Sequence, residues 1–239
     1  MDATLEVVQM KQDFLVGLKR SLKNNKVAEK ILGNSFIFKS NENEITSDLH
    51  WVGKDRASQM IVVLVDGHLN GNATSVLAQS VYHIVDELIL QEERVYPARL
   101  LMEIQGELRN QNFAKKVSRY ANERVRICVL AIDDKNDNAS YAANYNAIQA
   151  FDSNNSKLQD VASSGSFSLN STNKVFASTI DCNNTNMDGE SLNALIAGSI
   201  DLEMAEQYNL LRQKISDTSE LEEPNGFTLI GLDFSTMRN

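Results

Sequence analysis

One stretch, residues 61–67, constrains the fold more than any other part of the chain. It reads Ile-Val-Val-Leu-Val-Asp-Gly, and five consecutive apolar residues followed by a turn are typical of a buried strand. The strand ends on Asp66, and a buried carboxylate is costly to ionise unless a cation or several donors satisfy it. Gly67 then lets the backbone approach closely. Asp-Gly pairs also form plain turns, so the stretch predicts either a charged site or a simple turn.

The composition is that of a soluble globular protein with no nucleic-acid partner. The chain has 239 residues, is 42% hydrophobic and carries a net charge of -9, which disfavours binding to phosphate backbones or anionic membranes. No apolar run approaches the roughly 18–20 residues of a membrane span. The N-terminus lacks a basic segment followed by an apolar one, as a secretory signal would need. Cys128 and Cys182 suggest neither a disulfide framework nor a zinc site, so we expect a cytoplasmic protein.

Residues 1–33 predict an N-terminal helical lead-in to a domain at 34–239. Apolar residues near a helical period predict a helix over 4–23. A shorter helix at 26–32 would stop at Gly33, a residue suited to a helix C-terminus. The first helix could pack on the domain, or it could protrude to form a homodimer or contact a partner. The pattern is compatible with both arrangements.

The remaining segments predict an α+β fold with mostly antiparallel pairing. Strand patterns at 35–39, 45–52 and 59–65 indicate an antiparallel meander. Residues 152–174 predict loops with weak strands at most. The other predicted elements are helices at 74–90 and 98–109, a hairpin of strands at 125–132 and 139–151, a short strand at 175–177, helix at 190–215 in one or two pieces, and a strand at 226–234.

Two aspartates fall where neighbouring strands would bring them together. Asp48 lies in the strand pattern before the one that Asp66 ends, and antiparallel pairing can place them side by side. Two carboxylates at one site repel unless a cation lies between them. Mg²⁺ and Mn²⁺ prefer such oxygen ligands. A pair of solvated turn aspartates would give the same spacing, so spacing alone leaves both explanations open.

Five segments resemble, in the same order, the motifs of the SpoIIE/RsbU branch of the bacterial PP2C (PPM) phosphatases. They cover about residues 35–235, and the resemblance rests on order and spacing, because no single motif is intact. The segments are I-T-S-D-L-H-W at 45–51, I-V-V-L-V-D-G-H-L-N-G at 61–71, the strand pattern at 123–134, Y-A-A-N-Y-N-A at 141–147 and T-L-I-G-L at 228–232.

This resemblance implies a four-layer α-β-β-α sandwich, with two antiparallel sheets flanked by helices. It also implies hydrolysis of phosphoserine or phosphothreonine on a protein, with Mn²⁺ or Mg²⁺ holding the attacking water. Asp48 matches the first metal-binding aspartate of the family, and Asp66 matches the bridging one. Gly67 stands where a backbone carbonyl helps to hold the second metal.

The departures from the family pattern affect the metal centre. Ser47 replaces a glycine, and His68 is out of register with the family histidine. Ile180 stands where the family has an aspartate, and Asp181 could replace it only after a one-residue slip that turns its side chain to the other face. Asn225 places an amide where a charged ligand belongs. Because hard cations depend on ligand charge, we expect one weak Mn²⁺ or Mg²⁺ site or none.

Three functions follow from these observations. The first is a bacterial signalling protein with a degenerate centre, a pseudophosphatase that binds a protein partner of the STAS or receiver type. The second is an active Mn²⁺- or Mg²⁺-dependent serine/threonine phosphatase with Asp48, Asp66 and a slipped Asp181 as ligands. The third is an α+β scaffold unrelated to the family.

Overall fold

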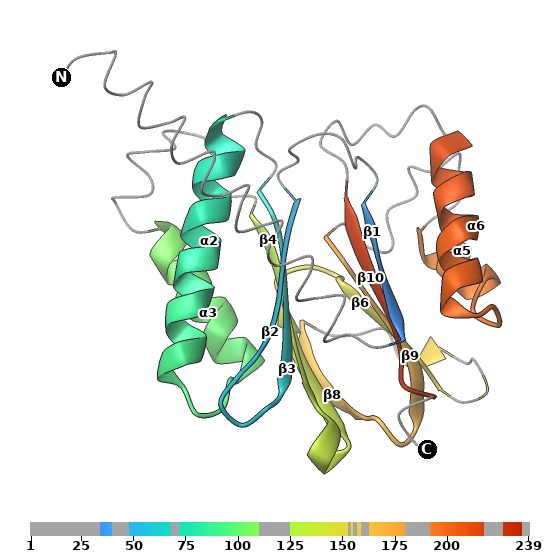
Figure 1. The fold of residues 1–239 in the computed structure, drawn as a ribbon, viewed down its shortest axis with the longest axis horizontal. Helices are drawn as coiled ribbons and strands as arrows, with labels where there is room; N and C mark the ends of the chain where they lie inside the picture. Colours follow the sequence, from blue (N-terminus) through green and yellow to red (C-terminus); the bar gives the residue numbers. More distant parts are fainter. Residues whose placement is uncertain are drawn as a thin grey trace.

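The computed structural model describes residues 34–39, 48–67, 72–109, 125–152, 154, 157–158, 163–179, 192–217 and 227–235. Two antiparallel sheets stack face to face within these ranges, with helices on both outer faces (Figure 1). The predicted four-layer α+β sandwich is therefore confirmed. The lead-in expected at 1–33 lies outside the described ranges, so its helices and its boundary with the domain remain predictions. None of the helices in the described part is long and apolar enough to cross a lipid bilayer.

One sheet is built around the buried stretch at residues 61–67. Its strands, in spatial order, are β2 (Asp48–Lys54), β3 (Met60–Asp66), β4 (Arg126–Asp133), β5 (Asn138–Ala143) and β8 (Ser164–Ser168). Every residue of β3 is buried, which explains its continuous apolar run. The edge strand β8 is mostly exposed and lies in the segment predicted to hold loops with weak strands at most, because its Ser-rich sequence has no apolar alternation.

The second sheet corrects two predictions about strand pairing. Its strands, in spatial order, are β1 (Ser35–Lys39), β10 (Thr228–Asp233), β9 (Thr172–Ser178), β6 (Ile148–Asp152) and β7 (Lys157–Leu158). The predicted three-strand meander is wrong, because β1 pairs with β10 in this sheet and not with β2. The predicted single strand at 139–151 is also wrong, because β5 and β6 belong to different sheets.

A bend at Asn144 carries the chain from one sheet to the other. The Asn144 side chain accepts a hydrogen bond from Ile127 N at 2.8 Å and donates one to Val125 O at 2.8 Å. These bonds add to the backbone bond from Asn144 N to Ile127 O, at 3.2 Å, at the point where β5 leaves β4. The Tyr145 hydroxyl then donates to the carbonyl of Ser178 at the end of β9, so the bend is attached to both sheets.

The helices cover the two outer faces of the sandwich through apolar contacts. Helices α2 (Asn72–Gln91) and α3 (Pro97–Arg109) pack on the β2–β3–β4 side, and α5 (Leu192–Gly198) and α6 (Met204–Asp217) pack on the other sheet. Trp51 in β2 donates from Nε1 to Asp86 Oδ1 of α2 at 2.9 Å. Tyr82 of the same helix donates from its hydroxyl to His50 O at 3.0 Å. The helix is thus joined to the sheet by polar as well as apolar contacts.

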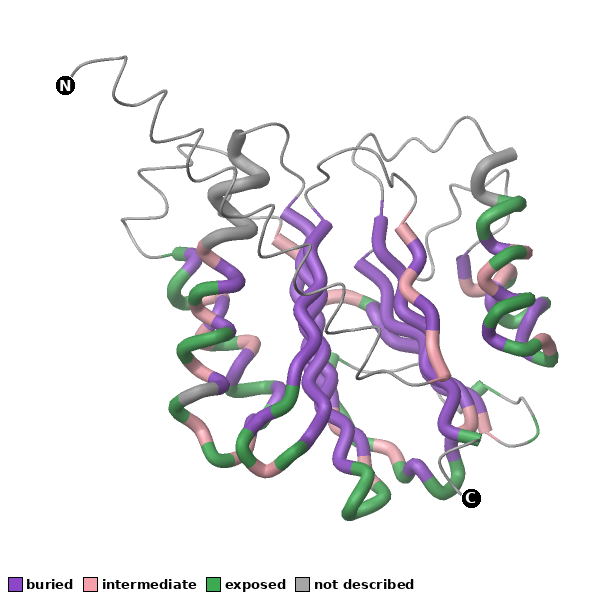
Figure 2. The backbone as a smooth tube through the Cα atoms, in the orientation of Figure 1, coloured by how far each residue is buried: buried purple, intermediate pink, exposed green. Residues whose placement is uncertain are grey.

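Three apolar clusters hold the layers together. One fills the space between the sheets, one lies under α2 and α3, and one lies under α5 and α6. Most of the strands are accordingly buried along most of their lengths, whereas the described parts of the helices alternate between buried and exposed positions (Figure 2). Cys128 lies in the inter-sheet cluster as a buried thiol, as predicted for a core residue.

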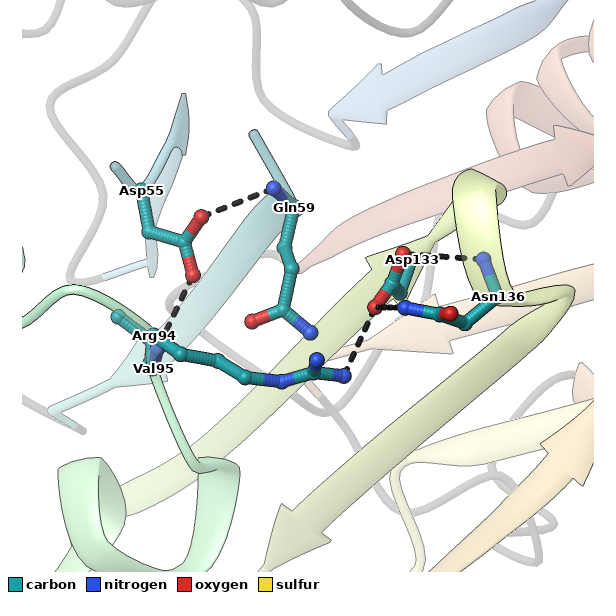
Figure 3. A network of polar contacts seen from close by, with 6 residues as sticks. All are labelled: Asp55, Gln59, Arg94, Val95, Asp133 and Asn136. Carbon is teal, nitrogen blue, oxygen red and sulfur yellow. Dashed lines mark hydrogen bonds and ion pairs between the residues drawn. The ribbon is translucent and has the colours of Figure 1, made fainter. Parts of the chain in front are cut away.

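A polar network ties the turn ends of β2, β3 and β4 together. It consists of Asp55, Gln59, Arg94, Val95, Asp133 and Asn136 (Figure 3). The Asp55 carboxylate accepts hydrogen bonds from Gln59 N at 2.8 Å and Val95 N at 2.9 Å. Arg94 Nη2 donates to Asp133 Oδ2 at 2.8 Å. Asp55 and Asp133 thus have partners within the protein. They lie at the end of the sheet opposite to Asp48 and Asp66, so we assign them a structural role.

Candidate functional site

Asp48 and Asp66 lie directly opposite each other where β2 begins and β3 ends. Both are buried, with 4% and 1% of their surfaces exposed, and directly opposite residues in an antiparallel pair have Cβ atoms about 4.5–5.5 Å apart. Val62 and Leu64 lie in the inter-sheet cluster. The alternation of side chains along a strand therefore places Asp66, and Asp48 opposite it, on the face toward the other sheet. The predicted juxtaposition of the two aspartates is confirmed.

Arg126 flanks Asp66 on its other side. It begins β4 and is the register partner of Asp66, with Nη1 3.8 Å from Asp66 Oδ2. The guanidinium carbon lies 6.0 Å from the centroid of the Tyr145 ring, within the range of a cation–π contact. Sequence reasoning treated Arg126 only as part of a strand pattern. Its position at the start of a strand next to β3 was the signal that could have identified it.

Lys39 brings a second basic group to this end of the sandwich. It ends β1, two residues after Ile37, which packs against the inter-sheet cluster. Burial lowers the pKa of the Lys39 ammonium, and the negative charge of Asp48 opposes that shift. This electrostatic coupling, together with the strand positions, indicates that Lys39 faces Asp48 across the gap between the sheets.

His50 lies one step further into the sandwich, on the same face of β2 as Asp48. Only 1% of its surface is exposed. Burial, together with the positive charge of Lys39, lowers the pKa of His50 to about 3. The imidazole is therefore neutral at neutral pH. The charged groups placed here by the described residues are two carboxylates and two basic side chains.

The other predicted site residues are only partly described. Gly67 is buried directly after Asp66, and the match of its carbonyl to a family ligand stays a prediction. Ile180, Asp181 and Asn225 lie outside the described residues, so the slip that would bring Asp181 into use stays a prediction. Before them, Thr179 closes the end of the second sheet, where its Oγ1 accepts a hydrogen bond from Thr228 N at 2.9 Å.

The described residues do not by themselves form a site for a divalent cation. Among them, no group of three or more His, Cys, Asp or Glu side chains comes close enough to hold a metal. The two aspartates that match family ligands are accompanied by Arg126 and Lys39, whose positive charges oppose the binding of another cation. The donors among the described residues therefore do not by themselves make up the metal centre that the resemblance implies.

Comparison with known proteins identifies the fold of this chain but does not establish its activity. No protein-family model matches the chain, and no curated protein matches its sequence. Solved structures do match. The SiaA-PP2C domain of Pseudomonas aeruginosa superposes with a TM-score of 0.72 and 13% identity, over 98% of this chain and 100% of that one.

Two further structures belong to the same class of fold. The PP2C phosphatase domain of SpoIIE from Bacillus subtilis, with a fragment of its regulatory domain, has a TM-score of 0.60 and 8% identity, over 83% of this chain and 62% of that one. RsbX in complex with magnesium has a TM-score of 0.54 and 9% identity, over 82% of this chain and 92% of that one. The chain thus has the fold of the SpoIIE/RsbU-type PP2C phosphatase domains. An α+β scaffold of a different fold is therefore excluded.

Proposed function

We propose that this chain is a bacterial signalling module of the PP2C fold that binds a protein partner without dephosphorylating it. Such a protein is a pseudophosphatase. One observation supports the proposal above all. Asp48 and Asp66 are the only two carboxylates that the described residues bring together at this end of the sandwich. In the sequence, Ile180 and Asn225 stand where the family has the other two.

Metal-dependent hydrolysis of a phosphoester makes demands that such a centre does not meet. In two-metal sites the ions generate the attacking hydroxide and clamp the phosphoryl oxygens. Replacing two of four carboxylates removes two negative charges that would face the ions, and oxygen sites for hard cations depend on that charge. We therefore expect Mn²⁺ or Mg²⁺ to bind weakly or not at all.

The partner classes follow from the context of the family. STAS-type proteins of partner-switching pathways and receiver domains of two-component pathways are the candidates, in phosphorylated or unphosphorylated form. We place this interaction in the cytoplasm. Calorimetry with purified proteins of both classes, with and without a phosphoryl group, tests the proposal. Binding by one class is expected, and absence of binding by all four forms would overturn the choice of partner.

A phosphatase assay tests the loss of catalysis. The purified full chain is incubated with a phosphoserine peptide or nitrophenyl phosphate in millimolar Mn²⁺, beside Asp66→Asn and the control Asp134→Asn. Asp134 is exposed and lies after the far end of β4. We expect all three proteins to show the same background rate. Mn²⁺-dependent turnover that disappears only in Asp66→Asn would overturn the proposal.

An active Mn²⁺- or Mg²⁺-dependent phosphatase is the second candidate. It is favoured by the retained pairing of Asp48 with Asp66 and by the buried Gly67 beside them. This function needs Asp181 as a third ligand. If turnover is found, Asp181→Asn should therefore abolish it. Asp188→Asn, at the next Asp-Gly pair along the sequence, is the control and should not.

A further inference from the structure

Two basic side chains converge on the paired aspartates, and the proposed function does not account for them. In a metal-dependent centre, buried carboxylates that face each other are balanced by divalent cations. Here Asp66 is flanked on one side by Asp48 and on the other by Arg126, because β3 lies between β2 and β4 in the sheet. Strand register therefore fixes a positive side chain beside the carboxylate that matches the bridging ligand.

The position of Arg126 is determined by its neighbours. Its Nη1 is 3.8 Å from Asp66 Oδ2, and its guanidinium group lies over the Tyr145 ring. The Tyr145 hydroxyl donates to Ser178 O at the end of β9, so the ring is itself attached to the second sheet. A guanidinium group is always charged and stacks well on aromatic rings. Arg126 thus presents a permanent positive charge to Asp66.

Lys39 supplies the second charge from the opposite sheet. It pairs with Thr228 at the end of β1, and the charge of Asp48 acts on its ammonium group. Among the described residues, the charges of the two carboxylates and the two basic groups at this site sum to zero. A divalent cation entering between the aspartates would meet two like charges and would disturb a cluster that is already balanced.

We infer that Arg126, with Lys39, is a built-in cation for the Asp48–Asp66 pair and takes over the charge-balancing role of the metal ions, so that this end of the sandwich is complete without metal. The inference goes beyond the proposed function because it concerns what stabilises the site and not what the protein binds. It predicts a PP2C-type fold whose stability does not respond to divalent cations.

Thermal unfolding and calorimetry with Mn²⁺ test this inference on the full chain. For the wild type we expect the same melting temperature in chelator and in millimolar Mn²⁺, and no heat of Mn²⁺ binding. Arg126→Gln should melt at a lower temperature in chelator and should regain stability on addition of Mn²⁺. Its affinity for Mn²⁺ should be at least about tenfold higher than that of the wild type, because a repelling charge is gone. Arg126→Lys, which keeps the charge, should stay insensitive to the metal.

Arg99→Gln is the matched control. Arg99 is an exposed arginine with ion pairs to Glu92 and Glu103 on the helix layer, so its replacement should leave the metal response unchanged. If Arg126→Gln does not fold, Lys39→Gln provides the same comparison from the other sheet. A wild type stabilised by Mn²⁺, or an Arg126→Gln protein that is as stable and as metal-insensitive as the wild type, would overturn the inference.

The outcomes separate this inference from the proposed function. A wild type that binds Mn²⁺ tightly without turnover would overturn the inference that Arg126 and Lys39 replace the metal ions. It would leave the pseudophosphatase standing. Phosphatase activity that persists in chelator would overturn the pseudophosphatase and leave the inference about Arg126 and Lys39 standing. Mn²⁺ binding together with turnover that is lost in Asp66→Asn would overturn both.

Discussion

The ring of Phe36 occupies the space where a side chain on Gly231 would lie. The two residues are register partners in the β1–β10 ladder, and a Cβ built on Gly231 would lie 2.5 Å from Phe36 Cε1. Phe36 also packs against Phe176 and Tyr208, with ring centroids 6.3 and 5.8 Å away. The ring therefore has little freedom to move aside.

Gly231→Ala should lower the free energy of unfolding by about 1–3 kcal/mol, the usual cost of overpacking a core. Urea unfolding measures the effect. Gly106→Ala is the control, because a Cβ there meets nothing within 4 Å and alanine replaces glycine inside helix α3. This variant should gain about 0.5–1 kcal/mol. Equal stability of the two variants would contradict the packing argument.

Asp55→Ala should be among the most destabilising single changes in the β2–β3 hairpin. The buried carboxylate accepts from the backbone N–H groups of Gln59 and Val95, and its loss leaves both donors without that acceptor. We expect a cost of about 2–6 kcal/mol, from about 1–3 kcal/mol for each of the two unsatisfied buried donors. Asp152→Ala also removes an acceptor, of Asn154 N, but at an exposed bond. It should cost less than about 1 kcal/mol in urea unfolding.

Asp133 should make stability depend on pH in the acid range. The hydrogen bond from the Asn136 side chain holds the pKa of the Asp133 carboxyl below its usual range, and Arg94 adds to that shift. A lowered pKa in the folded state stabilises the protein above the unfolded pKa of about 3.9, and this contribution is lost as the pH falls through the folded pKa. The stability difference between wild type and Asp133→Asn should therefore be larger at neutral pH than in acid.

Urea unfolding at neutral pH and well below pH 4 measures that difference. Asp134→Asn, at an exposed carboxylate in the same turn, should show a small difference that changes little between the two conditions. If the difference in free energy of unfolding between wild type and Asp133→Asn were the same at neutral pH and in acid, it would contradict the stabilising role of the ionised Asp133 carboxylate.

Tyr145→Phe should loosen the link between the sheets without removing the ring beneath Arg126. The variant loses the hydroxyl bond to Ser178 O but keeps an aromatic face for the guanidinium group. We expect a loss of about 1 kcal/mol, the net value of a typical hydrogen bond, in thermal unfolding followed by circular dichroism. Tyr96→Phe, at a residue that is 61% exposed, should leave the unfolding temperature unchanged.

The pairing of Asp48 with Asp66 was predictable because it depends on local patterns. A fully apolar run such as 61–65 fits a buried strand, and the strand before it is close enough in sequence to form a hairpin. The partner of β1 was not predictable in the same way. Alternation in residues 35–39 shows which side chains are buried, but it does not say which strand lies alongside.

The break between β5 and β6 was missed for a related reason. Apolar residues continue in alternation from Tyr141 through Ala147, although the Asn144 bend moves the chain to the other sheet. Arg126 escaped notice as a site residue because its neighbour in space, Asp66, is far from it in the sequence. Only the strand order β2–β3–β4 brings the two together.

The hydrogen bond from Trp51 to Asp86 has a practical consequence. Trp51 is the only tryptophan in the chain, it is 9% exposed, and it stands in β2 three residues after Asp48 while its indole contacts helix α2. Its ultraviolet emission is therefore an intrinsic optical reporter of the helix–sheet interface. A red shift of that emission would show α2 separating from the sheet, and occupation of the nearby site could be followed without attaching a label.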